Sequence, residues 1–234
     1  MKTGAVIVGA GAGVRLGADA PKCFVLVEGT PLLFLSAYAF EESTTISEII
    51  LVVPNDRIEE TWNYGHALGF RKLSAVRQGG LRRQDSVLAG LNAVSPSCEN
   101  ALVHDGARPL VSVELIDRVV SELRVSLAAL PALPVSDTLH HLGEYLTPGP
   151  ERSGLYAAQT PQGSRIHMLI EALNSSLLQG TTASDEATLL YHHLKVPSTL
   201  VDGDSSNIKI TVKGDLQFYQ PQLRERARKV KGEI

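Results

Sequence analysis

The sequence predicts an α/β protein with a mostly parallel sheet, helices on both faces and a protruding β-arm. Three observations support this prediction. Short apolar segments rich in Val, Ile and Leu alternate with stretches of helical periodicity, and they show little of the polar alternation of a half-exposed sheet. A glycine-rich stretch follows the first of these segments. After Pro134 the alternation stops, and histidine, glycine and proline accumulate without a helical period.

The expected elements follow from apolar periodicity and from residues that begin helices. Thr30 followed by Pro31 is typical of an N-cap with proline at the first helical position. Asp56, with Glu59 three residues later, is spaced as in a capping box. In chain order, we expect strands at 5–10, 49–53, 73–76, 101–103, 195–201 and 208–212, and helices at 32–42, from 56 onward, at 86–94, 112–125, 165–178 and 185–194, and from 215 onward.

The length and the turn-rich stretch set the domain organisation. At roughly 100 to 200 residues per domain, a chain of 234 residues fits a single domain. Residues 135–156 hold adjacent histidines and several turn-forming residues, with two short segments able to pair as strands. We therefore expect one Rossmann-like domain over residues 1–234, in which 135–156 form a β-arm.

Composition disfavours several classes of function. Lys and Arg number 22 against 25 Asp and Glu, so the net charge of −3 lacks the basic excess of proteins that coat nucleic acids. The longest apolar stretches, such as 49–53 and 127–130, are far shorter than the ~20 residues that cross a bilayer, and the first residues do not resemble a signal peptide. Cys23 and Cys98 form no CxxC motif. We expect a cytoplasmic protein with no nucleic-acid or membrane partner.

The glycine-rich stretch at 9–22 reads GAGAGVRLGADAPK. Glycines after a first strand let the backbone approach a phosphate and offer N–H donors, but they also make tight turns. The third glycine of a GxGxxG motif is missing, because Leu16 or Val14 stands at that position, and no Gly-Lys pair completes a Walker A loop. What remains is a glycine-rich loop with two cations, Arg15 and Lys22.

Further strings run in order along the chain. They are the GG…R…SV pattern of Gly79, Gly80, Arg83, Ser86 and Val87, then VHDGARP at 103–109, Arg152 with QTPQ at 159–162, and NIKIT at 207–211. With residues 9–22, this set resembles the cytidylyltransferase branch of the sugar and polyol nucleotidyltransferases. In order and spacing it is most similar to the 2-C-methyl-D-erythritol 4-phosphate cytidylyltransferase family, which transfers CMP from CTP to a polyol phosphate in the non-mevalonate isoprenoid pathway.

The resemblance implies a role for each matching residue. It places the catalytic cations Arg15, Lys22 and Lys209 around the CTP phosphates and makes Asp105 the ligand of a Mg²⁺ ion. The nucleotide is expected to meet Ala10, Gly11, Gly13, Gly79, Gly80, Arg83, Ser86 and Asp105, and the polyol phosphate to meet Arg108, Thr138, Arg152, Thr160 and Ser184. In the family the β-arm completes this second pocket across a dimer, so the resemblance implies a homodimer. It implies that Arg108 and Thr138 of one subunit act with Arg152, Ser184 and Lys209 of the other.

Several alternatives stay open from the sequence. Arg83 suits a structural ion pair as well as a phosphate, and Ser86 suits the N-cap of its helix. Asp105 would also serve as the cap of a turn. A ribitol-5-phosphate cytidylyltransferase shares the glycine loop and the NIKIT-like segment, and a non-catalytic nucleotide-binding subunit would keep the fold. The chain departs from the family pattern at Gly9, Leu16 and Ser184, of which only Ser184 falls at a predicted substrate position.

Overall fold

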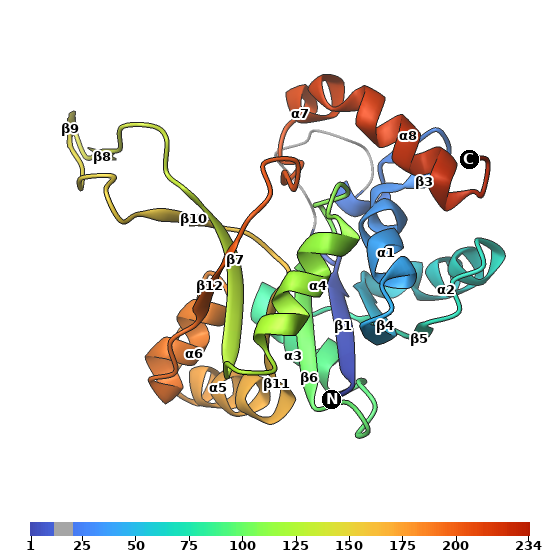
Figure 1. The fold of residues 1–234 in the computed structure, drawn as a ribbon, viewed down its shortest axis with the longest axis horizontal. Coiled ribbons are helices and arrows are strands. Elements are labelled where there is room, and N and C mark those ends of the chain that lie inside the picture. Colours follow the sequence, from blue (N-terminus) through green and yellow to red (C-terminus); the bar gives the residue numbers. More distant parts are fainter. Residues whose placement is uncertain (12–20) are drawn as a thin grey trace.

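The computed structural model describes residues 1–11 and 21–234, which form an eight-stranded sheet with helices on both faces (Figure 1). The strand order is β10-β7-β11-β6-β1-β4-β5, and β12 also pairs with β7. The strands are β1 (Thr3–Val8), β4 (Ile46–Val53), β5 (Leu73–Gln78), β6 (Asn100–Asp105), β7 (Ala128–Pro134), β10 (Tyr156–Ala158), β11 (Gln162–Arg165) and β12 (Thr199–Asp202). Only β10 and β11 run against the others in the described sheet, so the prediction of a mostly parallel α/β fold is confirmed.

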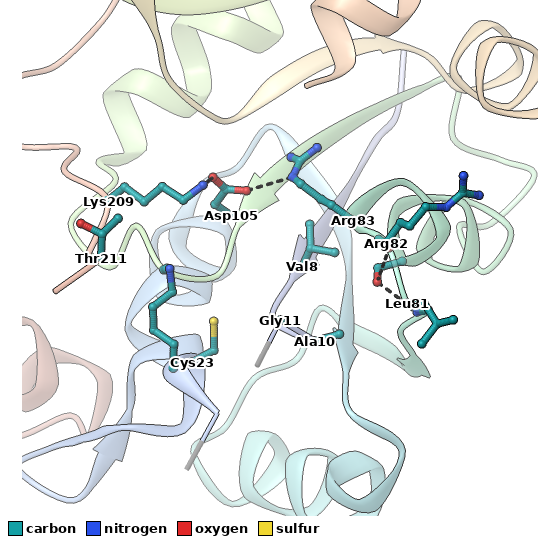
Figure 2. A pocket seen from close by; sticks show the side chains of 14 residues that line it. Val8, Ala10, Gly11, Cys23, Leu81, Arg82, Arg83, Asp105, Lys209 and Thr211 are labelled. Atoms are coloured by element: carbon teal, nitrogen blue, oxygen red, sulfur yellow. Dashed lines mark hydrogen bonds and ion pairs between the residues drawn. The ribbon is translucent and has the colours of Figure 1, made fainter. Parts of the chain in front are cut away.

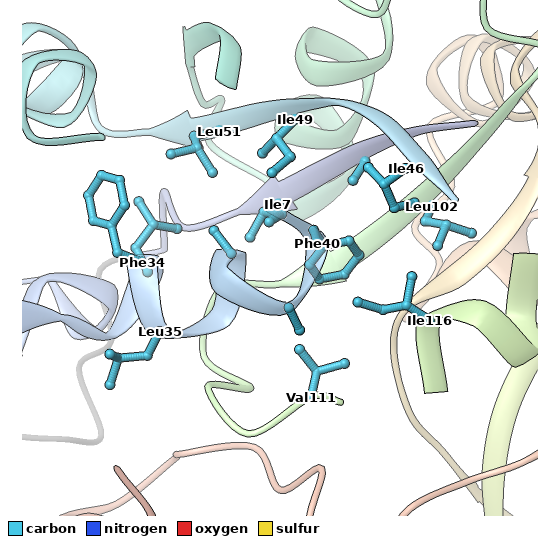
Figure 3. Packing of buried hydrophobic residues seen from close by; sticks show 14 of the residues in the cluster. Ile7, Phe34, Leu35, Phe40, Ile46, Ile49, Leu51, Leu102, Val111 and Ile116 are labelled. Carbon is cyan, nitrogen blue, oxygen red and sulfur yellow. The ribbon is translucent and has the colours of Figure 1, made fainter. Parts of the chain in front are cut away.

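Two hydrophobic clusters hold the helices on the sheet. The helices are α1 (Leu32–Glu42), α2 (Ile58–Ala67), α3 (Arg83–Leu91), α4 (Val113–Glu122), α5 (Ile166–Leu178), α6 (Glu186–Leu194), α7 (Lys213–Phe218) and α8 (Gln220–Val230). Because strand side chains alternate between faces, Ile7 of β1 belongs to a cluster that includes residues of α1, α4 and α8, whereas Val6 belongs to a second cluster with residues of α3, α5 and α6. Figure 3 shows the cluster that contains Ile7, in which Phe34 and Phe40 of α1 lie against the sheet.

Several predicted helix starts need correction. The helix at 32–42 is confirmed, but Pro31 is its N-cap and Thr30 lies in the short strand β3 (Thr30–Pro31), which pairs with β2 (Leu26–Val27). The capping box at Asp56 is wrong, because a 3₁₀ turn, η3 (Asn55–Arg57), precedes α2, and its N-cap residue Arg57 makes no side-chain cap hydrogen bond. In both places a preceding structured segment fixes the helix start, so a side-chain cap is not required.

The remaining differences are shifted boundaries and strands that were not expected. β1 spans Thr3–Val8 where 5–10 was expected, and β7, β10 and β11 were not predicted. Helix α3 begins at Arg83, so Ser86 is inside it and is not the N-cap. Residues 208–212 are not a strand, although the Ile210 N–H donates to the Ala107 carbonyl at 2.8 Å. The expected strand at 195–201 is shorter and shifted, as β12, and the closing helix is divided into α7 and α8.

Residues 135–155 project from the sheet as an arm (Figure 1). Near its tip, β8 (His140–Leu142) and β9 (Leu146–Pro148) form a separate antiparallel pair whose residues are all exposed. Tyr156 belongs to β10 in the main sheet, so the expected arm boundary is one residue too long. Across the described ranges, the helices are too short or too polar for any of them to span a bilayer.

Candidate active site

A cavity of about 610 Å³ opens at the carboxyl ends of the central strands (Figure 2). Parallel α/β sheets commonly bind ligands at this edge, because the loops that leave the strands converge there. β1 leads to Ala10 and Gly11, and β6 ends at Asp105. The lining is Val8, Ala10, Gly11, Lys22, Cys23, Gly80, Leu81, Arg82, Arg83, Ser86, Asp105, Ala107, Lys209 and Thr211.

A second, smaller cavity of about 240 Å³ adjoins the first. Its lining is Arg83, Asp105, Arg108, Ala158, Gln159, Thr160, Gln162, Ser184, Asp185 and Lys209. Three side chains, those of Arg83, Asp105 and Lys209, line both cavities. They therefore form the wall at which a molecule in one cavity meets a molecule in the other.

Asp105 is the centre of this shared wall. Its carboxylate lies 2.7 Å from Lys209 Nζ, 3.2 Å from Arg83 Nε and 3.9 Å from Arg108 Nε. Burial alone would raise the pKa of Asp105, but these three cations hold it well below its usual range. The carboxylate is therefore ionised at neutral pH, and three positive side chains are gathered around one negative one.

Arg83 connects Asp105 to a residue that the sequence did not single out. Its Nη1 and Nη2 lie 2.6 and 3.1 Å from the two carboxylate oxygens of Glu186. Burial opposes the charge of Arg83, but Glu186 and Asp105 raise the pKa of the guanidinium above its usual value. Glu186 was missed because an acid in the first turn of a helix is expected for the helix dipole alone.

Lys22 and Cys23 lie in the turn η2 (Lys22–Phe24), which returns the chain to the cavity. Cys23 is buried, and burial raises the pKa of its thiol to about 12 despite the nearby Lys22. A thiol with that pKa is not ionised at neutral pH, so Cys23 contributes a small apolar surface to the cavity and not a nucleophile. Predicted residues Gly13 and Arg15 fall outside the described ranges.

Gly80 and Ser86 line the larger cavity, and Gly79 lies against Ala10 and Ser86. A Cβ on Gly79 would collide with Ala10 and would lie 2.8 Å from Ser86 Oγ, so only glycine fits there. The Ser86 hydroxyl accepts a hydrogen bond from the Gly80 N–H at 3.1 Å. Ala10, Gly80 and Ser86, predicted to meet the nucleotide, thus line the larger cavity, whereas Gly79, predicted to meet it as well, packs against Ala10 and Ser86 without lining the cavity.

Thr160 and His104 form a chain of hydrogen bonds that ends at the backbone of Asp105. The Thr160 hydroxyl accepts a hydrogen bond from the Asp105 N–H at 3.1 Å and lies 3.0 Å from His104 Nδ1. His104 is fully buried, which lowers its pKa to about 3, so the ring is neutral. With Nδ1 accepting from Thr160, the proton on Nε2 faces the Arg108 carbonyl at 3.3 Å. Thr160 is 4% exposed but lines the smaller cavity, so its contact with the polyol phosphate stays a prediction.

Two glutamines of the QTPQ string fasten the loops that carry site residues. The Gln159 amide exchanges two hydrogen bonds with the backbone of Asp204, at 2.8 and 3.0 Å. Gln162 donates to the Asp185 carboxylate at 2.9 Å and accepts from the Ala187 N–H at 3.0 Å. The segment at 159–162 therefore fixes both the loop before Lys209 and the start of α6, a role for which the sequence offered no signal beyond the string itself.

The predicted polyol-phosphate residues are divided between two places. Arg108, Thr160 and Ser184 line the smaller cavity together with Lys209, so the expected division of Arg108 from Ser184 and Lys209 between two subunits is wrong. Thr138 and Arg152 lie on the arm, where both are exposed and the Arg152 guanidinium donates to the Ser136 carbonyl. Within the single chain, the structure brings neither arm residue into the lining of these two cavities.

The donor set allows one ionised carboxylate to serve a metal ion. Within residues 1–11 and 21–234, no three His, Cys, Asp or Glu side chains cluster as a metal-binding group. Mg²⁺ usually takes one or two carboxylates and completes its shell with phosphate oxygens and water. Asp105 fits such an ion only together with phosphate ligands, because its present partners are cations.

Comparison with known proteins agrees with the sequence motifs. The family model of 2-C-methyl-D-erythritol 4-phosphate cytidylyltransferase matches residues 3–225. The chain is 43% identical over 228 residues to the bifunctional enzyme IspD/IspF of Desulfotalea psychrophila, covering 97% of this chain but 58% of that longer enzyme. It is 37% identical to 2-C-methyl-D-erythritol 4-phosphate cytidylyltransferase of Alkaliphilus oremlandii, with 96% of both chains covered.

A solved structure shows the same fold. The 4-diphosphocytidyl-2C-methyl-D-erythritol synthase of Anaerococcus prevotii superposes with a TM-score of 0.82 at 27% identity, covering 95% of this chain and 96% of that one. Fold, motif order and relatives therefore lead to one conclusion. The chain belongs to the 2-C-methyl-D-erythritol 4-phosphate cytidylyltransferase family of nucleotidyltransferases.

Proposed function

We propose that the chain transfers CMP from CTP to the phosphate of 2-C-methyl-D-erythritol 4-phosphate, releasing pyrophosphate and forming 4-diphosphocytidyl-2-C-methyl-D-erythritol. The observation that carries this proposal is the wall of Arg83, Asp105 and Lys209 shared by the two cavities. A nucleotide in the larger cavity and a polyol phosphate in the smaller one would meet at this wall. Transfer between two bound anions requires such a junction.

The chemistry explains why the wall is cationic. A phosphomonoester with a second pKa of ~6 is already mostly a dianion at neutral pH, so the attacking oxygen needs no general base. The obstacle is repulsion between two anions and the charge on the departing pyrophosphate, which fixed positive groups relieve. Lys22 and Lys209 supply that charge in the larger cavity, and Arg108 supplies it in the smaller one.

The cofactor that we propose is Mg²⁺, held by Asp105 and by phosphate oxygens of the nucleotide. When bound, such an ion neutralises phosphate charge and polarises the phosphoryl group under attack. Asp105 is suited to hold it because its carboxylate is ionised and faces both cavities. Lys209, now 2.7 Å from Asp105, is then available to contact phosphate.

We also propose that the working form is a cytoplasmic homodimer in which the arm of one subunit reaches the smaller cavity of the other. The arm carries Thr138 and Arg152, and its tip exposes Leu142, Tyr145 and Leu146 with no contact to the core of its own chain. Mixing two inactive variants tests this arrangement. Lys22→Ala and Arg152→Ala chains, mixed in equal amounts, should regain about a quarter of the sites of the wild type. No recovery in a mixture that forms mixed dimers would contradict the arrangement.

The activity itself is tested by pyrophosphate release from the purified protein with Mg²⁺ and CTP. Release should require 2-C-methyl-D-erythritol 4-phosphate and should fall strongly when UTP or ATP replaces CTP. A clear preference for ribitol 5-phosphate would assign the chain to the ribitol enzyme instead. If CTP binds but neither polyol phosphate supports release, the chain is a non-catalytic nucleotide-binding subunit.

A further inference from the structure

Glu186 is a carboxylate that is only 4% exposed, although the proposed reaction requires no direct contact with it. It begins α6, and its partner Arg83 begins α3, 103 positions earlier in the chain. An arginine in the first turn of a helix opposes the helix dipole. The position of Arg83 therefore needs another source of stabilisation.

The geometry of the pair supplies it. Both terminal nitrogens of Arg83 face both oxygens of Glu186, at 2.6 and 3.1 Å, which is the two-point arrangement that fixes a guanidinium plane. Its third contact is Nε to Asp105 at 3.2 Å. Among the described residues, carboxylates thus use three of the five N–H donors of Arg83, and two remain available for a phosphate.

The two carboxylates that hold Arg83 have different surroundings. Asp105 is shared with Lys209 and Arg108, and under the proposed function it also serves Mg²⁺ and phosphate. Glu186 lines neither cavity and has Arg83 as its ion-pair partner in the described part of the chain. When the contacts of Asp105 rearrange, Glu186 is the remaining carboxylate, among the described residues, that can keep Arg83 in its place.

We infer that Glu186 is a positioning residue, which holds the Arg83 guanidinium at the junction of the two cavities while Asp105 exchanges its cationic partners for ligands. This inference rests on the proposed function. It assigns to Glu186 no contact with substrate, and it makes the effect of Glu186 depend entirely on Arg83.

The test is a double-mutant cycle with Glu186→Gln and Arg83→Lys. Glu186→Gln keeps one acceptor oxygen but loses the charge and the two-point contact. Misplacing Arg83 should lower kcat about 10- to 100-fold, with the Kd for CTP changed less than about threefold. The double variant should be no slower than the slower single variant, because both changes remove the same arrangement. The inference would be overturned if the two substitutions lowered kcat by factors that multiply in the double variant, or if Glu186→Gln had normal turnover.

Two controls separate this result from misfolding and from failure of the proposed function. Glu60→Gln removes the charge from an exposed ion pair, in which Glu60 lies 2.7 Å from Arg57, and it should leave turnover and fold unchanged. The Arg83 Nη–H signals in ¹⁵N NMR, whose protons face Glu186, should exchange slowly with water in the wild type and rapidly in Glu186→Gln. If wild-type protein shows that protection but releases no pyrophosphate, the reaction is wrong while the positioning holds. If Glu186→Gln keeps the protection, the positioning is wrong.

Discussion

At the scale of single residues, Lys209 and Lys22 carry the largest share of the proposed chemistry. Lys209 shares the junction with Asp105, and Lys22 enters the larger cavity from η2. Removing one preorganised contact to developing charge typically costs about 10²-fold in kcat, so Lys22→Ala and Lys209→Ala should each lose at least that much. Lys213→Ala, an exposed lysine of α7, is the matched control and should turn over normally. Near-normal kcat in either cavity variant would remove that lysine from the catalytic set.

His104 makes a prediction about stability and pH. The unfolded chain protonates this ring near pH 6.5, but burial lowers the folded pKa to about 3. Below pH 6.5 the unfolded state therefore binds more protons, and the free energy of unfolding should fall with pH, with a slope approaching about 1.4 kcal/mol per pH unit. Urea unfolding between pH 7 and 4 measures this slope. His104→Asn should lose the contribution, while His167→Asn, at an exposed position, should retain it.

The sequence located residues in this site with uneven success, and the reason is physical. Asp105 and Lys209 were found because their motif strings are continuous along the chain. Glu186 and His104 act through partners 103 and 56 positions away, and such pairing exists only after folding. Arg83, for which an ion pair and a phosphate contact both stayed open, has the ion pair and keeps donors for the second role.

At the scale of elements, α3 depends on close contact with the sheet. A Cβ on Gly90 would press into Val6 and come within 2.9 Å of Val52 Cγ2. Gly90→Ala should therefore destabilise the protein by about 1 to 3 kcal/mol, although alanine is the better helix former. Gly214→Ala in α7 is the control, because no heavy atom lies within 4 Å of its added Cβ. Equal stability of the two variants in urea would show that α3 can move away from the sheet.

Strand β7 was missed because of its prolines. Strand β7 contains Pro131 and Pro134, and proline argues against a strand because it cannot donate to a ladder. The structure tolerates Pro131 because its carbonyl still accepts from the Gln159 N–H at 2.7 Å. The prediction at 208–212 was wrong in the opposite sense, since apolar alternation suggested a strand there. Among the described residues, this segment is joined to Ala107 by a single backbone hydrogen bond.

At the scale of the whole molecule, the arm should decide the oligomeric state without affecting the core. The Gly149 N–H donates to the Leu139 carbonyl at 3.0 Å, so two glycines can replace residues 140–148 and close the arm below its tip. This variant should be a monomer in sedimentation equilibrium while keeping the wild-type melting temperature, because neither core cluster includes the arm. A shortened protein that stays dimeric would place the interface elsewhere.

Because β8 and β9 are separate from the main sheet, the tip of the arm should open independently of the rest of the molecule. Their residues are all exposed and their ladder touches no buried cluster. In an isolated subunit, the amide protons of this hairpin should exchange with deuterium almost as fast as in an unfolded peptide. Those of β1 and β6 should exchange only when the whole subunit unfolds. The amide protons of the tip should therefore become protected from exchange as subunits associate. The rise of this protection with protein concentration would give the dissociation constant of the subunits.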